Sequence, residues 1–188
     1  MESLLKRILK CESCQSFLPS GPRPVVQLGL HSKILIIGQA PGRWVHQTGI
    51  PWNDASGRTL RKWLDVDEAT FYNPDFFSIM PMGFCYPGKG KSGDLPPRTE
   101  CAPLWHSAIL SHFKSEPLVL LIGQYAQAYY LKPAFKASLT DTVKNYKEFL
   151  PKYFPLPHPS PRNQGWLKVN PWFGEEVLPA LQMEVKLR

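Results

Sequence analysis

A short apolar segment that ends in a glycine-rich turn constrains the fold of this chain more than any other feature. Ile34-Leu-Ile-Ile37 has four consecutive apolar residues, three of them β-branched, and Gly38-Gln-Ala-Pro-Gly42 follows directly. Such a run is typical of a strand covered on both faces, as in a parallel sheet. In open α/β sheets, ligands bind beyond the carboxyl ends of these strands, and glycines let the backbone approach a ligand closely. The alternative is an ordinary turn between a strand and a loop.

The same pattern returns later in the chain. Residues 118–122 form a second buried apolar run, and Gly123-Gln124 and a helical pattern to residue 131 follow it. Further strands are expected at 76–80 and 153–156. Helices are expected at 3–11, 54–64, 102–113 with Thr99 as its cap, 140–149, and from Asn170-Pro171 onward. This alternation predicts a three-layer α/β/α sandwich with a central four-stranded, mostly parallel sheet.

Two segments between these elements lack a regular pattern. Residues 43–52 show no clear periodicity, and residues 81–97 are rich in glycine and proline. A loop as long as the second is usually functional or disordered in a compact domain. Lys89 and Lys91 make it basic, so phosphate contacts are expected there.

Length and charge restrict the possible partners. The 188 residues predict a single domain, in which residues 1–24 supply an N-terminal helix and a Cys-x2-Cys segment. A net charge of +7 favours a polyanionic partner, with nucleic acid as the leading candidate. The absence of a long apolar run and of a signal peptide predicts a cytoplasmic protein without a membrane segment. We expect a monomer.

The four cysteines suggest a metal centre. Cys11 and Cys14 form a close pair, whereas Cys85 and Cys101 flank the basic loop. Four thiolates suit tetrahedral zinc or a [4Fe–4S] cluster, and the wide spacing of the second pair favours the cluster. The alternative is four unrelated buried cysteines. A cluster would join the N-terminal helix to the basic loop.

Two motifs taken together carry a family resemblance. Gly38-Gln-Ala-Pro-Gly42 and His158-Pro-Ser-Pro-Arg-Asn163 resemble the signature motifs of the uracil-DNA glycosylase superfamily. The cysteine spacing is similar to the iron–sulfur class called family four, and Arg162-Asn163 is similar to the single-strand-selective monofunctional glycosylases. The resemblance implies an enzyme of base excision repair that flips a deaminated base, with uracil as the expected one, out of DNA. It would then hydrolyse the N-glycosidic bond.

The resemblance also implies roles for individual residues. Gly38, Gln39, Ala40, Pro41 and Gly42 would lie under the flipped base and hold the attacking water. Trp52 matches the position of an aromatic residue that stacks on the base, and His158 would donate a hydrogen bond to the base O2 as the bond breaks. Ser160 would contact phosphate, Arg162 would fill the space left by the flipped nucleotide, and Asn163 continues this DNA-binding loop.

The chain departs from the family pattern in two places. Family four has Glu where this chain has Gln39, and other classes have Asp or Asn at Ala40, so the first motif contains no carboxylate. An Asn that reads the base edge is also missing, and Ser78 is the candidate to replace it. His46 is a candidate for positioning water, and the favoured alternative is a solvent-exposed histidine in a loop. The rival functions are a uracil-DNA binding or covalent-capture protein without turnover, and a structural zinc or iron–sulfur nucleic-acid binder.

Overall fold

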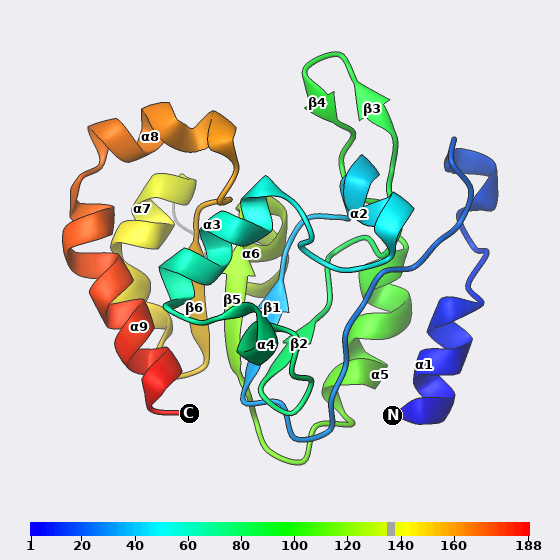
Figure 1. The fold of residues 1–188 in the computed structure, drawn as a ribbon, viewed down its shortest axis with the longest axis horizontal. Helices are drawn as coiled ribbons and strands as arrows, with labels where there is room; N and C mark the ends of the chain where they lie inside the picture. The colour runs from blue at the N-terminus through cyan, green and yellow to red at the C-terminus, as the bar shows by residue number, and fades with distance from the viewer. Residues whose placement is uncertain (135–137) are drawn as a thin grey trace.

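A four-stranded parallel sheet forms the centre of the protein. The structure is a computed structural model that describes residues 1–134 and 138–188. The strands are β1 (Ile34–Ile37), β2 (Phe77–Ile79), β5 (Leu118–Ile122) and β6 (Tyr153–Leu156), in the order β2-β1-β5-β6 (Figure 1). Every neighbouring pair in this sheet is parallel. The predicted α/β sandwich with four central strands is therefore confirmed.

The sheet is buried on both faces, as the apolar run in β1 predicts. Ile34 and Ile36 belong to one hydrophobic cluster and Leu35 and Ile37 to another, and all four side chains are fully buried. Successive side chains of a strand point to opposite faces, so an uninterrupted apolar strand requires a layer of helices on each side.

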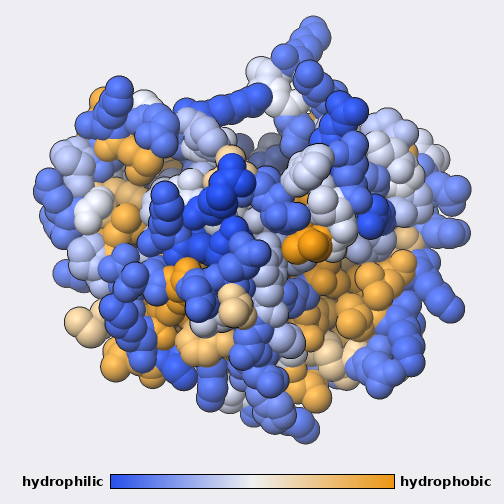
Figure 2. Space-filling model, viewed as in Figure 1, coloured by the Kyte–Doolittle hydropathy of each residue, from blue (hydrophilic) through white to orange (hydrophobic). Residues whose placement is uncertain are grey.

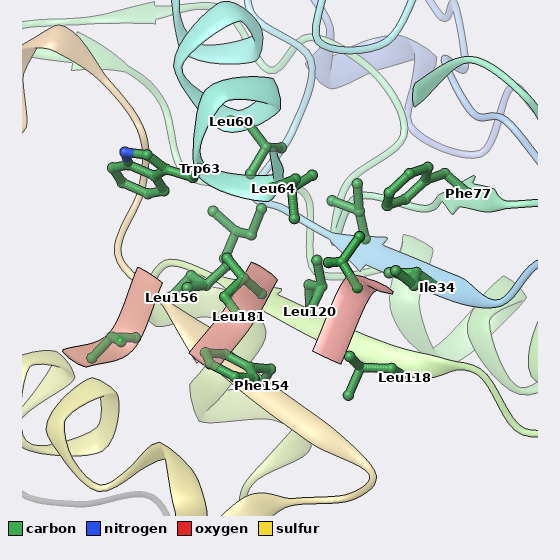
Figure 3. Packing of buried hydrophobic residues seen from close by; sticks show 14 of the residues in the cluster. Ile34, Leu60, Trp63, Leu64, Phe77, Leu118, Leu120, Phe154, Leu156 and Leu181 are labelled. Carbon is green, nitrogen blue, oxygen red and sulfur yellow. The ribbon is translucent and has the colours of Figure 1, made fainter. Parts of the chain in front are cut away.

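One face is covered by helices from the middle and the end of the chain. Figure 3 shows Leu60 and Leu64 beside Ile34, Leu120 and Leu156 of the sheet. The helices that contribute to this cluster are α3 (Ala55–Leu64), α4 (Glu68–Phe71), α7 (Leu139–Lys144), η3 (Tyr146–Phe149), the π-helix η5 (Phe173–Val177) and α9 (Leu178–Lys186).

The other face is covered mainly by the N-terminal helix and the helices before and after β5. Leu4 and Ile8 of α1 (Glu2–Leu9) are buried here, in agreement with the predicted helix. The other helices of this layer are the π-helix η2 (Ala102–His106), α5 (Ser107–Leu110) and α6 (Gln124–Tyr130). Thr99 does not cap this helical segment, because the residue before η2 is Cys101.

Several short elements were not expected from the sequence. Residues 81–97 contain a hairpin of β3 (Lys89–Gly90) and β4 (Gly93–Asp94), and residues 43–52 contain α2 (Arg43–Thr48). The helix α8 (Gln164–Val169) and the 3-10 turns η1 (Gln15–Phe17) and η4 (Pro161–Asn163) complete the chain, so helical structure begins before Asn170. Elements this short depend on tertiary packing, so periodicity does not reveal them. In the described part of the chain, no helix is long and apolar enough to cross a bilayer.

Candidate active site

A cavity of about 490 Å³ opens beyond the carboxyl ends of the sheet strands. Its lining includes all five residues of the first motif, Gly38 to Gly42, and residues His158, Ser160, Arg162 and Asn163 of the second. Figure 2 shows a hollow at the top of the molecule, between the β3–β4 hairpin and the segment that leads into α8. Parallel strands end at the same edge of a sheet, and this is why motifs far apart in the chain meet here.

The first motif is held in place by the segment that follows β2. The Met82 N–H donates to the Gly38 carbonyl at 2.8 Å, and the Gly83 N–H donates to the Gln39 carbonyl at 3.0 Å. The Gln39 side-chain amide donates to the Leu95 carbonyl at 3.4 Å. The turn is therefore fixed between β2 and the segment after the hairpin, and it is a rigid wall of the cavity.

Trp52 lies in the cavity wall with a strained backbone. Its φ angle of 56° is in the left-handed region, which is unusual for a bulky residue. A Cβ at position 57 would lie 1.6 Å from the Trp52 carbonyl oxygen, and a Cβ at position 38 would lie 2.9 Å from its indole ring. Gly38 and Gly57 therefore make room for Trp52. Its ring centroid lies 5.5 Å from that of His158.

His158 lies in the proline-rich loop after β6, opposite Trp52. The Asn163 side-chain amide donates to the His158 carbonyl at 2.7 Å and holds this loop closed. Burial lowers the pKa of His158 below its usual value of 6.5, and the charge of Asp54 partly opposes this shift. The imidazole is therefore mainly neutral at pH 7, with one ring nitrogen that carries a proton and can donate a hydrogen bond.

Asp54 is a cavity residue that the motifs did not reveal. It is the N-cap of α3, where its Oδ1 accepts a hydrogen bond from the Gly57 N–H at 2.8 Å. It also lines the cavity, and its charge raises the pKa of His158. In the sequence an Asp before a helix is sufficiently explained as a cap. The tertiary structure shows that the cavity has a carboxylate although the first motif has none.

Arg162 connects the second motif to the hairpin across the cavity. Its Nη1 donates to the Ser92 carbonyl at 2.8 Å, and a Cβ at position 93 would lie 2.6 Å from this nitrogen. Lys89 lines the cavity on the hairpin side, whereas Lys91 is exposed at the tip and is not part of the lining. The structure thus brings four of the five predicted DNA-binding residues, all except Lys91, to the cavity lining.

The sequence of this region identifies the family. A sequence model described as the uracil DNA glycosylase superfamily matches residues 26–182. The chain belongs to the uracil DNA glycosylase superfamily. Both motifs and all residues that line the cavity except Val25 lie inside the matched range, whereas Cys11 and Cys14 precede it. Membership of this superfamily supports DNA glycosylase activity, with DNA as the substrate, in general terms.

Ser78 does not take the place of the missing base-reading residue in this superfamily member. Its side chain is fully buried and is not part of the cavity lining. The Ser78 hydroxyl accepts from the Gly29 N–H at 2.9 Å and lies 2.7 Å from the Ser32 hydroxyl. It therefore fixes the loop before β1, and the expectation that it reads a base was wrong.

His46 also lies away from the cavity. Val45 lines the cavity, and the next residue of a helix points about 100° away from it. The His46 ring lies 6.0 Å from the Tyr86 ring, and burial together with the charge of Arg23 lowers its pKa. The suggestion that His46 positions the attacking water was therefore wrong.

The four cysteines lie together around a second, much smaller cavity. Cys11, Cys14, Cys85 and Cys101 are all free thiols that line it. Burial raises the pKa of Cys85 to about 11 and that of Cys101 to about 12, so both thiols stay protonated at pH 7 unless a cation stabilises the thiolates. The predicted grouping of the cysteines is present, although no two of them are adjacent in the sequence.

The position of Trp52 leads to a first prediction. Trp52→Ala should weaken binding of an oligonucleotide that carries a non-cleavable uracil analogue by about 5- to 150-fold, because stacking on an aromatic face contributes ~1–3 kcal/mol per base. Trp52→Phe retains an aromatic face and should bind within a few-fold of the wild type. Thermal unfolding of both variants controls for the packing of Trp52 against α3. Unchanged binding by a folded Trp52→Ala variant would show that the indole is only structural.

Proposed function

We propose that the protein is a monofunctional DNA glycosylase that flips a deaminated base into the cavity and hydrolyses its N-glycosidic bond. Uracil is the first candidate for this base. The observation that carries the proposal is that both motifs line one cavity in which an indole and a neutral imidazole lie 5.5 Å apart. A flipped base needs a face on which to stack and a donor for the oxygen on which negative charge develops. Trp52 and His158 provide these two groups.

The cavity residues support a dissociative reaction. As the bond between the base nitrogen and the sugar C1′ breaks, the electron pair leaves with the base, and the sugar becomes positively charged. His158 stabilises the departing anion through its N–H donor. Asp54, which also lines the cavity and whose charge acts on His158, stabilises the positive sugar and accepts a proton from the attacking water. Gln39 can only orient this water.

We also propose that the four cysteines hold a [4Fe–4S] cluster, as in the family-four class. In the described residues, no group of three or more His, Cys, Asp or Glu side chains is arranged to hold a metal ion. Tetrahedral zinc with bonds of about 2.3 Å would require the four sulfurs to lie about 3.8 Å apart. A cluster takes one thiolate on each of four irons, so its ligands are further apart. Zinc remains the alternative.

The cluster would be structural and would supply no step of the hydrolysis. Its thiolates would join the segment after α1 to both ends of residues 85–101, the region that includes the β3–β4 hairpin. The Arg98 side chain lies beside this site, since it interacts with Cys14 and lies over the Phe17 ring at 4.3 Å. Such a link would position two groups of the hairpin at the cavity mouth: Lys89 and the Ser92 carbonyl, which accepts a hydrogen bond from Arg162.

This proposal gives a second prediction. Protein purified without oxygen should be brown and contain about four irons and four sulfides per chain, whereas Cys85→Ser and Cys101→Ser should be pale and less stable. His112→Ala, which changes a metal-binding residue type outside the site, is the matched control and should remain brown. Colourless protein with one zinc per chain would contradict the cluster and support the alternative.

One experiment tests the glycosylase against its rivals. End-labelled oligonucleotides that contain uracil, hypoxanthine or xanthine are incubated with the protein and treated with alkali, and the released base is analysed. A glycosylase gives free base and an alkali-labile site. A covalent-capture protein, which the absence of a carboxylate in the first motif favours, gives a band of lower mobility. An intact strand with all three bases would support a binding protein without turnover.

A further inference from the structure

A highly exposed tryptophan lies beside the cavity mouth. Trp44 is the second residue of α2, and 59% of its surface is exposed. Large aromatic side chains bury much of their surface in most proteins, because each has a large apolar area. Neither motif includes Trp44, and the proposed chemistry does not use it. The side chain therefore needs another explanation.

The position of α2 places Trp44 close to the cavity. Helix α2 begins directly after the first motif, and both Gly42 and Val45 line the cavity. Trp44 lies between them in sequence and points outward from the same helical turn. Figure 1 shows α2 directly below the β3–β4 hairpin. The charges of Arg43 on α2 and Asp94 on β4 both act on Tyr86, which confirms that these two elements are neighbours.

Basic residues outnumber acidic ones around Trp44, where Asp94 of the hairpin is an acidic neighbour. The chain has no acidic residue between Glu12 and Asp54, and this range includes all of α2. Arg43 precedes Trp44, and the Arg23 Nη1 donates to the Gln47 carbonyl at 2.8 Å, near the end of the helix. The hairpin adds Lys89 and Lys91. An exposed aromatic face with cations around it is the arrangement that binds single-stranded nucleic acid.

We propose that Trp44 stacks on an unpaired base next to the flipped nucleotide. This inference rests on the proposed function and extends it to the form of the substrate. A base inside a duplex is covered on both faces by its neighbours, so it offers no face to Trp44. The protein therefore favours single-stranded or locally open DNA, which it holds by one aromatic platform inside the cavity, Trp52, and one outside it, Trp44.

Binding to DNA that contains a tetrahydrofuran abasic analogue tests the platform without any chemistry. Trp44→Ala should weaken binding to the single strand by about 5- to 150-fold, and Trp44→Phe should stay within a few-fold of the wild type. Binding to the matched duplex should change by less than about threefold. Met183→Ala on α9, which also removes an exposed apolar side chain, is the control and should change neither affinity. An equal loss for single strand and duplex would overturn the proposal.

A double-mutant cycle then identifies the stacked base. The bases on either side of the analogue are removed one at a time, and each strand is measured with the wild type and with Trp44→Ala. At one position the base removal and the mutation should each weaken binding, and together they should cost little more than either alone. Independent effects at every position would contradict stacking. Loss of binding to anionic vesicles in Trp44→Ala, with unchanged DNA affinity, would assign the side chain to a membrane surface instead.

The two proposals fail in different ways. If the wild type releases none of the three deaminated bases but the cycle shows coupling at Trp44, the proposed glycosylase function is wrong and the platform is correct. If the wild type releases base and Trp44→Ala binds all strands normally, the platform is wrong and the glycosylase function is correct.

Discussion

His158→Ala is expected to slow single-turnover base excision by about 10²–10³-fold. A preorganised donor at an oxygen that gains negative charge contributes ~3–4 kcal/mol in comparable sites. The His158 ring meets this requirement, since its loop is held by Asn163 and its lowered pKa keeps the ring neutral, with one N–H donor, at pH 7. DNA affinity should change little, because the hydrogen bond strengthens only as the base leaves.

Gln39→Ala is the variant with which His158→Ala should be compared. Gln39 lines the same cavity but has no charge, and its side-chain amide already donates to the Leu95 carbonyl. Its replacement should reduce the rate much less than the loss of His158. Both variants are measured on one substrate under single-turnover conditions, with DNA binding and thermal unfolding as controls. A slower Gln39→Ala enzyme with normal binding would show that positioning of water limits the rate, and the assigned roles would be reversed.

Asp54→Asn is expected to reduce the same rate by about 10²-fold, because it removes the carboxylate that we propose acts on the sugar cation and the attacking water. The substitution changes charge with almost no change in shape. The Asn side-chain oxygen can still accept from the Gly57 N–H, and Asn is as good an N-cap as Asp, so α3 should keep its stability. Asp94→Asn is the matched control, since Asp94 also lines the cavity but lies on the hairpin.

The electrostatic part of this prediction can be measured without substrate. The charge of Asp54 raises the pKa of His158, so the pKa of His158 should fall further in Asp54→Asn and remain unchanged in Asp94→Asn. NMR titration of the imidazole gives both values. If Asp54→Asn excises base at the wild-type rate while the His158 pKa falls, the carboxylate acts on the histidine but takes no part in the reaction. If Asp94→Asn is the slower enzyme, the catalytic carboxylate is on the hairpin.

Some site residues can be found in the sequence and others cannot, for a physical reason. Gln39, Trp52 and His158 lie in or near short motifs. The turns in these motifs need glycine and proline, so the motifs can be recognised in the sequence. Asp54 has a sufficient local explanation as a helix cap, and nothing local shows that it faces the cavity. Ser78 is the opposite case: it was the candidate to replace the missing base-reading Asn, but it is the middle residue of β2 and its hydroxyl is hydrogen-bonded inside the fold.

The sequence by itself determined the parallel sheet, its layers of helices and the place of the first motif. Four apolar strands such as Ile34–Ile37 can be buried only between two layers, whatever the rest of the chain does. Only the tertiary structure decided which side chains meet. It placed Asp54 by His158, connected Arg162 to the hairpin and turned His46 away from the cavity. Asp54 and His158, like Arg162 and the hairpin, are distant in sequence, and the helix α2 that orients His46 is too short for its sequence pattern to reveal it.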